Sequence, residues 1–221
     1  MHLKSIESPP YHRVFGLTGI MGSGKTTVAA MLEDKGAILV RADELARYAT
    51  TPEYEGYDRV RNNLTEQLEP LSQQRYGESI FDGENLNRAN TARLVFEDEN
   101  ALSILNTIIH REVGVQFREA VDQTPANKMI VYDVPLLYEI KIEKLVKKVI
   151  VVYVPEEIAI ARALARTKLT RMQVEKRLKK QISIEKKKEM ADYVIDNREN
   201  LEQLKAQMDP LWLWLLKWKT K

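Results

Sequence analysis

The first residues with recognisable chemistry form a glycine-rich segment, GIMGSGKT, at residues 19–26. It matches the Walker A pattern of a glycine, four residues and then Gly-Lys-Ser/Thr, which binds nucleotide phosphates. Glycines let successive backbone N–H groups turn inward around phosphate oxygens at the start of a helix. We expect Lys25 to reach the β and γ phosphates and the Thr26 hydroxyl to bind the Mg²⁺ that bridges them. The predicted nucleotide contacts here are Gly19, Gly22, Ser23, Gly24, Lys25, Thr26 and Thr27.

Two carboxylates follow predicted strands and are candidates for acid–base and metal chemistry. Asp43 lies in VRADELAR, just after the second predicted strand, where the carboxyl end of a parallel sheet gathers ligands. There it can accept the proton of an attacking hydroxyl, or cap the helix that follows, and the two roles are compatible. Asp133 ends the apolar run KMIVYD, where a Walker B carboxylate holds Mg²⁺ directly or through water.

Arg162 and Arg166 are four residues apart in a stretch predicted to be helical, so they share one helix face. Two guanidinium groups on one face can close over a triphosphate and stabilise charge on the transferring phosphoryl group. The alternative is an ordinary solvated face. We treat both arginines as candidate catalytic residues, together with Lys25 and Asp43.

Apolar runs and helical stretches alternate along the chain and predict an α/β fold with a mostly parallel sheet. The first strand, 13–18, leads into the phosphate loop, and a helix at 26–35 ends at Gly36. The second strand, 37–40, is at a distance that fits a crossover to a parallel neighbour of the first. Further strands are predicted at 128–133, 148–154 and 193–196. The expected architecture is a three-layer P-loop NTPase core around a parallel five-stranded sheet.

The chain is predicted to be a single kinase chain in which two helical segments are added to the core. Residues 43–122 are polar and contain no convincing buried strand, which indicates a helical substrate-binding insertion at about 45–120. Residues 156–190 are highly charged and helical by composition, and we expect a lid at about 160–188. The core then consists of residues 13–44, 121–160 and 189–221.

Composition limits the classes of protein and partner. The 221 residues suffice for one compact core, and a formal net charge of +2 gives no reason to expect nucleic-acid binding. The absence of cysteine excludes disulfides, thiolate metal sites and cysteine catalysis. The basic run at 177–188 is expected to be lid and solvated helix, and a helix with Trp212, Trp214 and Trp218 to dock on the core rather than on a membrane surface. We expect a cytoplasmic monomer or small homo-oligomer without stable membrane association.

These motifs occur in the order found in dephospho-CoA kinases, which the chain resembles over about residues 13 to 200. The shared segments are the phosphate loop, ADELAR, LNR near Arg88, VF at 95–96, the region of His110, DVPLLYE and ADYVIDN. The resemblance implies a P-loop kinase core, a helical domain for a CoA-like substrate and a lid that carries arginines. It also implies that ATP and Mg²⁺ are used to phosphorylate the ribose 3′-hydroxyl of dephospho-CoA, the last step of coenzyme A biosynthesis.

The resemblance assigns roles to single residues as well. It places the catalytic aspartate at Asp43, and at Asn197 either a contact to the adenine of ATP or a residue that closes a turn. Glu139 follows the turn that begins at Pro135, and its role stays open. The implied substrate contacts are Arg88, His110, Pro135 and Leu136.

Three positions depart from the pattern of that family. Arg41 stands where an acid is frequent, Arg111 where proline usually follows the histidine, and Thr167 where aspartate is frequent. Two alternatives therefore remain: another P-loop kinase for a small molecule or nucleotide, and a nucleotide-binding protein with weak catalysis. The chain has no Asn-Lys-x-Asp motif for guanine, which counts against a GTP switch.

Overall fold

The structure, a computed structural model, describes residues 12–219. The chain forms two compact units. One combines the part up to Arg41 with the part from Thr124 onward, and we call it the core unit. The other, Ala42–Gln123, is the helical unit. Each is described by itself below.

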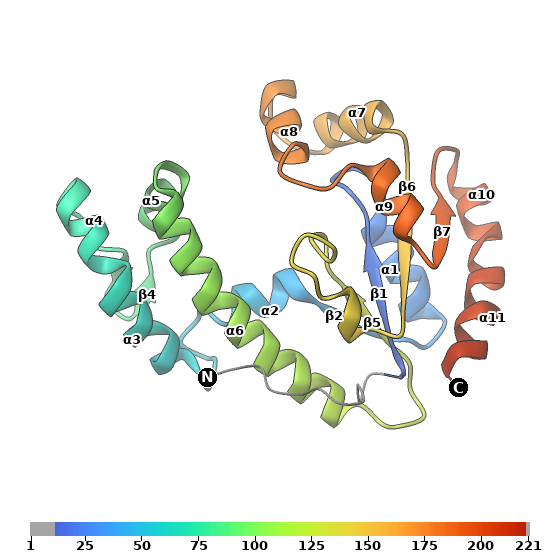
Figure 1. Ribbon diagram of the computed structural model, residues 1–221, viewed down its shortest axis with the longest axis horizontal. Helices are drawn as coiled ribbons and strands as arrows, with labels where there is room; N and C mark the ends of the chain where they lie inside the picture. Colours follow the sequence, from blue (N-terminus) through green and yellow to red (C-terminus); the bar gives the residue numbers. More distant parts are fainter. Residues whose placement is uncertain (1–11, 220–221) are drawn as a thin grey trace. The chain divides into compact units, whose positions relative to one another are not determined.

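The core unit contains a five-stranded parallel sheet in the order β2-β5-β1-β6-β7 (Figure 1). β1 is buried along its whole length and pairs with β5 on one side and β6 on the other, as a continuous apolar run predicts. The predicted fold class is therefore confirmed. The strands are β1 Val14–Thr18, β2 Ile38–Arg41, β5 Ile130–Asp133, β6 Lys148–Tyr153 and β7 Tyr193–Asp196.

The prediction that β2 is the direct neighbour of β1 is wrong, because β5 lies between them. β5 is buried throughout, whereas β2 is only partly buried and Ile38 is 38% exposed. A four-residue strand with an exposed apolar side chain suits the edge of a sheet better than its centre. In this register both Leu17 of β1 and Arg41 of β2 are aligned with Asp133 at the end of β5.

One face of the sheet carries the main apolar cluster of the core unit. Phe15 and Leu17 of β1 pack there with Leu32 of α1 and with Leu211 and Leu215 of α11. The three tryptophans of α11 are partly buried against the same cluster, which confirms that this helix docks on the core. The helices of this layer are α1 Lys25–Asp34, α10 Leu201–Ala206 and α11 Met208–Lys219.

The other face is covered by the segment that follows β5. A side chain at Gly16 of β1 would lie 2.5 Å from the Leu137 side chain and 3.2 Å from Val146, so glycine allows this segment to lie against the sheet. The segment contains a short 3-10 helix, Glu143–Leu145. The charged stretch between β6 and β7 forms three helices, α7 Glu156–Arg166, α8 Arg171–Leu178 and α9 Ile184–Met190.

The helical unit has its own apolar core, in which Leu64, Leu68, Ile80 and Leu94 are fully buried. A small hairpin turns at Gly83, which has φ 60°, and was not expected from the sequence. No helix within residues 12–219 is long and apolar enough to cross a membrane. The elements of this unit are α2 Ala42–Tyr48, α3 Tyr57–Gln67, α4 Glu69–Tyr76, β3 Phe81–Asp82, β4 Asn85–Leu86, α5 Arg88–Glu97 and α6 Glu99–Gln123.

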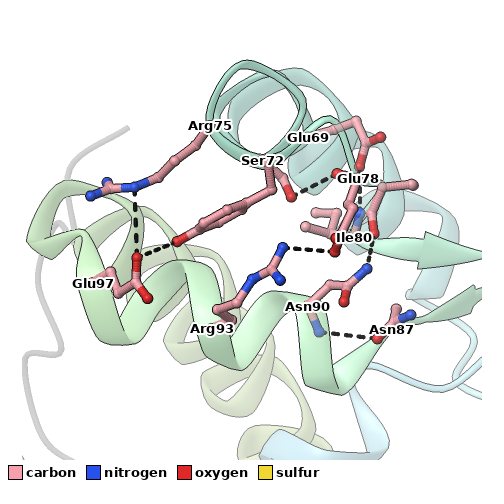
Figure 2. A network of polar contacts seen from close by, with 11 residues as sticks. Glu69, Ser72, Arg75, Glu78, Ile80, Asn87, Asn90, Arg93 and Glu97 are labelled. Carbon is pink, nitrogen blue, oxygen red and sulfur yellow. Dashed lines mark hydrogen bonds and ion pairs between the residues drawn. The ribbon is translucent and has the colours of Figure 1, made fainter.

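Polar contacts hold the segment between α4 and α5 in place (Figure 2). The Glu69 carboxylate accepts the N–H of Ile80 at 2.9 Å, and the Asn90 amide donates to the carbonyl of Ser79 at 2.8 Å. The side chain of Asn87 caps α5 by accepting the N–H of Asn90. This cap fixes the start of α5, where Arg88 is the first residue.

Candidate active site

The phosphate loop of the core unit has a backbone that strongly favours glycine at two positions. Gly22 and Gly24 have φ of 83° and 87°. A side chain at Gly22 would collide with the carbonyl oxygen of Ala159 in α7, and one at Gly24 with the amide of Asn197. The loop closes through the N–H of Ser23, which donates to the carbonyl of Ile20 at 3.0 Å. Its N–H groups are thus held at the start of α1, where a helix attracts phosphate.

Ser23 adds a second indication of a ligand at this loop. Its side chain is fully buried, and its hydroxyl has no hydrogen-bond partner among the described residues. A buried hydroxyl without a partner is costly in a finished fold. A phosphate oxygen bound in the loop would accept the hydrogen bond of the Ser23 hydroxyl.

Lys25 forms an ion pair with Asp133, so the structure brings together the two residues predicted from separate motifs. Asp133 is 6% exposed and ends β5, while Lys25 is the first residue of α1. The Thr26 side chain follows on the exposed surface of the first turn, and Thr27 is half-buried behind it. A hydroxyl and a carboxylate are hard oxygen donors that fit Mg²⁺, so these residues are compatible with the predicted metal.

No group of three or more His, Asp or Glu side chains that could hold a metal by itself occurs within residues 12–219. A magnesium ion that is bound through one carboxylate, one hydroxyl and the phosphates needs no such group. The assignment of Thr26 and Asp133 to the metal stays a prediction.

Asn197 contacts the phosphate loop from the end of β7. Its side-chain amide donates to the carbonyl of Ser23 at 2.7 Å, and its own N–H donates to the carbonyl of Tyr153 at 2.8 Å. It is 8% exposed. The amide therefore supports the loop that binds phosphate, whereas the predicted contact to adenine is left untested.

The two arginines of α7 differ in their surroundings. The Arg162 guanidinium donates to the carbonyl of Asn197 at 2.7 Å and lies 3.4 Å from the carbonyls of Arg198 and Glu199. Arg166 is the last residue of α7 and is exposed. Arg162 thus holds the segment after β7, whereas Arg166 is accessible to solvent.

Asp43 belongs to the helical unit and lies in the first turn of α2, exposed to solvent. The helix begins at Ala42, so Asp43 is inside the helix and the capping alternative is wrong. Asp43 lines a cavity of about 370 Å³ together with Arg47, Thr50 and Arg88. Arg88 donates to the Thr50 hydroxyl at 2.9 Å and to the carbonyl of Arg47 at 3.2 Å.

The rest of this cavity, which we call the acceptor cavity, is mainly apolar. Its wall includes side chains from β4, α5 and α6. A cavity with a carboxylate, guanidinium groups and an apolar wall suits a ligand that is both polar and apolar. His110 is exposed on α6 and is not among its lining residues, so its predicted substrate contact gains no support from the cavity. The apolar lining consists of Ala46, Leu86, Ala92, Val95, Leu105 and Ile109.

Comparison with known proteins decides the family. The family model described as dephospho-CoA kinase matches residues 13–203. The chain belongs to the dephospho-CoA kinase family. The dephospho-CoA kinase of Carboxydothermus hydrogenoformans is 35% identical over 212 residues, which cover 94% of this chain and 95% of that protein. That of Deinococcus radiodurans is 37% identical over 205 residues, or 91% and 92% of the two chains.

Solved structures agree with this assignment. The crystal structure of TT1252 from Thermus thermophilus has a TM-score of 0.73 and 31% identity, and covers 93% of this chain and 98% of that one. The dephospho-CoA kinase from Campylobacter jejuni has a TM-score of 0.65 and 25% identity, with 91% and 96% covered. Both similarities extend over the core and helical units.

The departures from the dephospho-CoA kinase pattern lie outside the phosphate loop. Arg41 makes a 3.4 Å contact with Glu33 of α1. The Thr167 hydroxyl donates to the carbonyl of Ala163 at 2.8 Å, at the end of α7. Arg111 is exposed on α6. None of the three replaces a residue of the loop or of the ion pair between Lys25 and Asp133.

Sequence reasoning missed one residue of the dephospho-CoA kinase core, Lys187 of α9. Its ammonium is fully buried and donates to the carbonyl of Pro135 at 2.8 Å. The Pro135 carbonyl is thus occupied within the core, and Leu136 beside it is 39% exposed. Lys187 lies in a run of charged residues that favours a solvated face. The available signal was its spacing of three from Ile184, an apolar residue on the same helix face.

Proposed function

We propose that this chain transfers the γ-phosphoryl group of ATP to the 3′-hydroxyl of the ribose of dephospho-CoA, and so forms CoA and ADP. The observation that carries the proposal is the pairing of Lys25 with Asp133 beside a glycine-shaped phosphate loop, in a chain of this family. The acceptor cavity, lined by Asp43 and Arg88, supports the choice of acceptor. The relatives in Carboxydothermus hydrogenoformans and Deinococcus radiodurans are both named dephospho-CoA kinase.

On the nucleotide side, the N–H groups of the loop bind the β and γ phosphates, and the Ser23 hydroxyl gains an acceptor. Lys25 exchanges the Asp133 carboxylate for phosphate oxygens, because both are anionic oxygen acceptors for its ammonium. Thr26 and Asp133 would hold Mg²⁺, which neutralises charge on the β and γ phosphates when it is bound.

On the acceptor side, Asp43 takes the proton of the 3′-hydroxyl as its oxygen bonds to the γ-phosphorus. The bond from that phosphorus to the β–γ bridging oxygen breaks, and ADP leaves. A general base of this kind contributes about 10²- to 10⁴-fold in rate. Asp43 follows Arg41 by two residues, and Arg41 is aligned with Asp133. Two residues extend a chain by about 7 Å at most, so the Asp43 backbone lies within that distance of the Arg41 backbone.

Arg166 is the arginine that we assign to the phosphoryl group, because it is exposed at the end of α7. The lid proposed from the sequence is best limited to the segment around α8. α9 is bound to the core, since the Tyr153 hydroxyl donates to Glu185 at 2.8 Å and the Tyr138 hydroxyl donates to the carbonyl of Met190 at 3.0 Å. Closure over the nucleotide would exclude water and complete the site.

The test is ADP release by the purified chain with ATP and Mg²⁺, with and without dephospho-CoA, and the mass of the product. We expect release that depends on the acceptor and a product heavier by one phosphoryl group. Lys25→Ala and Asp43→Asn should each remove most of it, and Asp58→Asn is the matched control, because Asp58 is an exposed aspartate in the first turn of α3. A folded chain that binds ATP and gives no release dependent on dephospho-CoA would overturn the proposal.

A further inference from the structure

Lys187 is the most deeply buried charged residue of α9. Its side chain is 0% exposed, whereas Lys186 and Lys188 on either side are exposed. Removing an ammonium from water is unfavourable, and replacing a buried ion pair by apolar side chains is often neutral or stabilising. Fold stability alone is therefore a weak reason for a lysine at this position.

The partners of Lys187 belong to the segment that follows β5. Its ammonium donates to the carbonyl of Pro135 at 2.8 Å and lies 2.9 Å from the Glu139 carboxylate. The same Glu139 oxygen accepts the N–H of Ile182, just before α9, at 2.9 Å. The Glu139–Lys187 pair thus joins α9 to the chain immediately after Asp133.

The Pro135 carbonyl also connects this pair to the phosphate loop. It accepts a second hydrogen bond, at 3.0 Å, from the hydroxyl of Thr18, which directly precedes Gly19. One backbone oxygen, two residues after Asp133, is therefore held both from the strand that leads into the loop and from α9. Burial lowers the pKa of Lys187, the Glu139 carboxylate opposes this, and the charge of Lys25 lowers the pKa further, so the two ammonium groups lie within electrostatic reach.

In the proposed function the Lys25 ammonium exchanges Asp133 for the phosphate oxygens of the nucleotide. The Asp133 carboxylate then loses the cation that holds it in this structure. The contacts of Lys187 do not involve Lys25 or Asp133 and can persist through that exchange.

We propose that Lys187 is a positioning residue for phosphoryl transfer: through the Pro135 carbonyl and the Glu139 carboxylate it keeps Asp133 in place after Lys25 has moved to the nucleotide. This inference rests on the proposed function and deepens it. It assigns to α9 the role of positioning Asp133, whereas the sequence of the basic run 177–188 predicts only a lid and a solvated helix.

The experiment compares Lys187→Met, Glu139→Gln and the double variant with the wild type. Lys187→Met alone leaves the partly buried Glu139 carboxylate without its cation, and we expect it to lower the melting temperature as well as kcat. The double variant removes both charges and keeps an oxygen for the N–H of Ile182, so we expect it to recover most of the melting temperature. Its kcat should stay about 10- to 100-fold below wild type, as for residues that orient a metal ligand, with an unchanged KM for dephospho-CoA. Lys186→Met, at the exposed neighbour, is the control and should match wild type.

Binding of ADP supplies a readout without turnover. The double variant should bind ADP in EDTA as tightly as wild type, because the loop is intact, and lose about 10-fold or more of the affinity gained with Mg²⁺. If kcat and melting temperature recover together in the double variant, or if the gain with Mg²⁺ is unchanged, Lys187 is only structural and the proposal fails. If the wild type fails to phosphorylate dephospho-CoA, the proposed function fails, while ADP binding still decides the role of Lys187.

Discussion

The Asn197 side chain is the polar residue that most directly supports the phosphate loop from outside it. Asn197→Ala removes the hydrogen bond to the Ser23 carbonyl and opens space beside Gly24. A lost hydrogen bond of this kind costs about 1 kcal/mol, so the KM for ATP should rise about 5- to 10-fold with a smaller change in kcat. Steady-state kinetics at saturating acceptor measure this. Asn106→Ala, an exposed asparagine of α6, is the control, and an unchanged KM for ATP in Asn197→Ala would contradict the role.

The two arginines of α7 should separate in kinetics, although the sequence pairs them. Arg166→Ala should lower kcat by about 10²-fold or more while the melting temperature stays unchanged, because an exposed arginine that reaches the phosphoryl group does little for the fold. Arg162→Ala should lower the melting temperature and raise the KM for ATP, since the carbonyls after β7 lose their donor. Steady-state kinetics and thermal unfolding of both variants distinguish the roles. If both variants lost kcat to a similar extent with an unchanged melting temperature, the joint clamp of two arginines over the triphosphate would be restored.

These residues also mark how far the sequence predicts the site. The glycines and Lys25 of the loop could be predicted, because local backbone geometry and the charge of a phosphate dictate them at fixed spacing. The contacts of Asn197 and Lys187 could not, because both depend on which segments meet in space. A lysine between two exposed lysines has the local pattern of a solvated helix face, and only tertiary burial distinguishes it.

At the scale of elements, strands were easier to predict than their order. The buried runs in β1, β5 and β6 are apolar and β-branched, so their existence follows from composition. Their order depends on where the chain returns after the helical unit, and β5 takes the position beside β1 that proximity in sequence suggested for β2. The hairpin of β3 and β4 was missed because each strand has two residues, too few to show a period.

A buried carboxylate links three segments of the helical unit. Glu112 of α6 is 2% exposed, accepts the Tyr54 hydroxyl at 3.0 Å and accepts the Arg59 guanidinium at 2.9 Å. Burial would raise the pKa of Glu112, but the hydrogen bonds from Arg59 and Tyr54 prevail and lower it. Burial, together with the hydrogen bond to Glu112, raises the pKa of Tyr54 to about 12. The ionised carboxylate is therefore the form that stabilises this unit.

Glu112→Gln should lower the free energy of unfolding by about 1–3 kcal/mol at pH 7, because the buried Tyr54 side chain and the exposed Arg59 guanidinium lose an ionised acceptor. A lowered pKa in the folded state gives stability that is present above the unfolded pKa, about 4.3, and is lost as the pH falls through the folded value. The difference from wild type should thus shrink below about pH 4. Denaturant unfolding at pH 7 and at pH 3.5 measures it, with Glu99→Gln as an exposed control. A difference that does not depend on pH would exclude the ionised pair as the cause.

At the scale of the whole molecule, the candidate residues for the two substrates lie in different compact units. The phosphate loop, Asp133 and Asn197 belong to the core unit, whereas Asp43 and Arg88 belong to the helical unit. The assignment of the helical unit to the acceptor stays a prediction, as do the cytoplasmic location and the monomer or small homo-oligomer. Because the candidate residues for the two substrates are in different units, the binding of each substrate can be measured in the absence of the other.

Each ligand should therefore stabilise the folded chain independently. A ligand that binds only the folded state at 100 times its Kd adds about 2.7 kcal/mol, which thermal unfolding detects. Lys25→Met should remove the stabilisation by ADP and keep that by dephospho-CoA. Arg88→Lys keeps the charge but loses the planar fork of donors, so it should remove most of the stabilisation by dephospho-CoA and keep that by ADP. If Arg88→Lys lost both effects, Arg88 would act through the fold of the chain, and the acceptor cavity would no longer explain the choice of substrate.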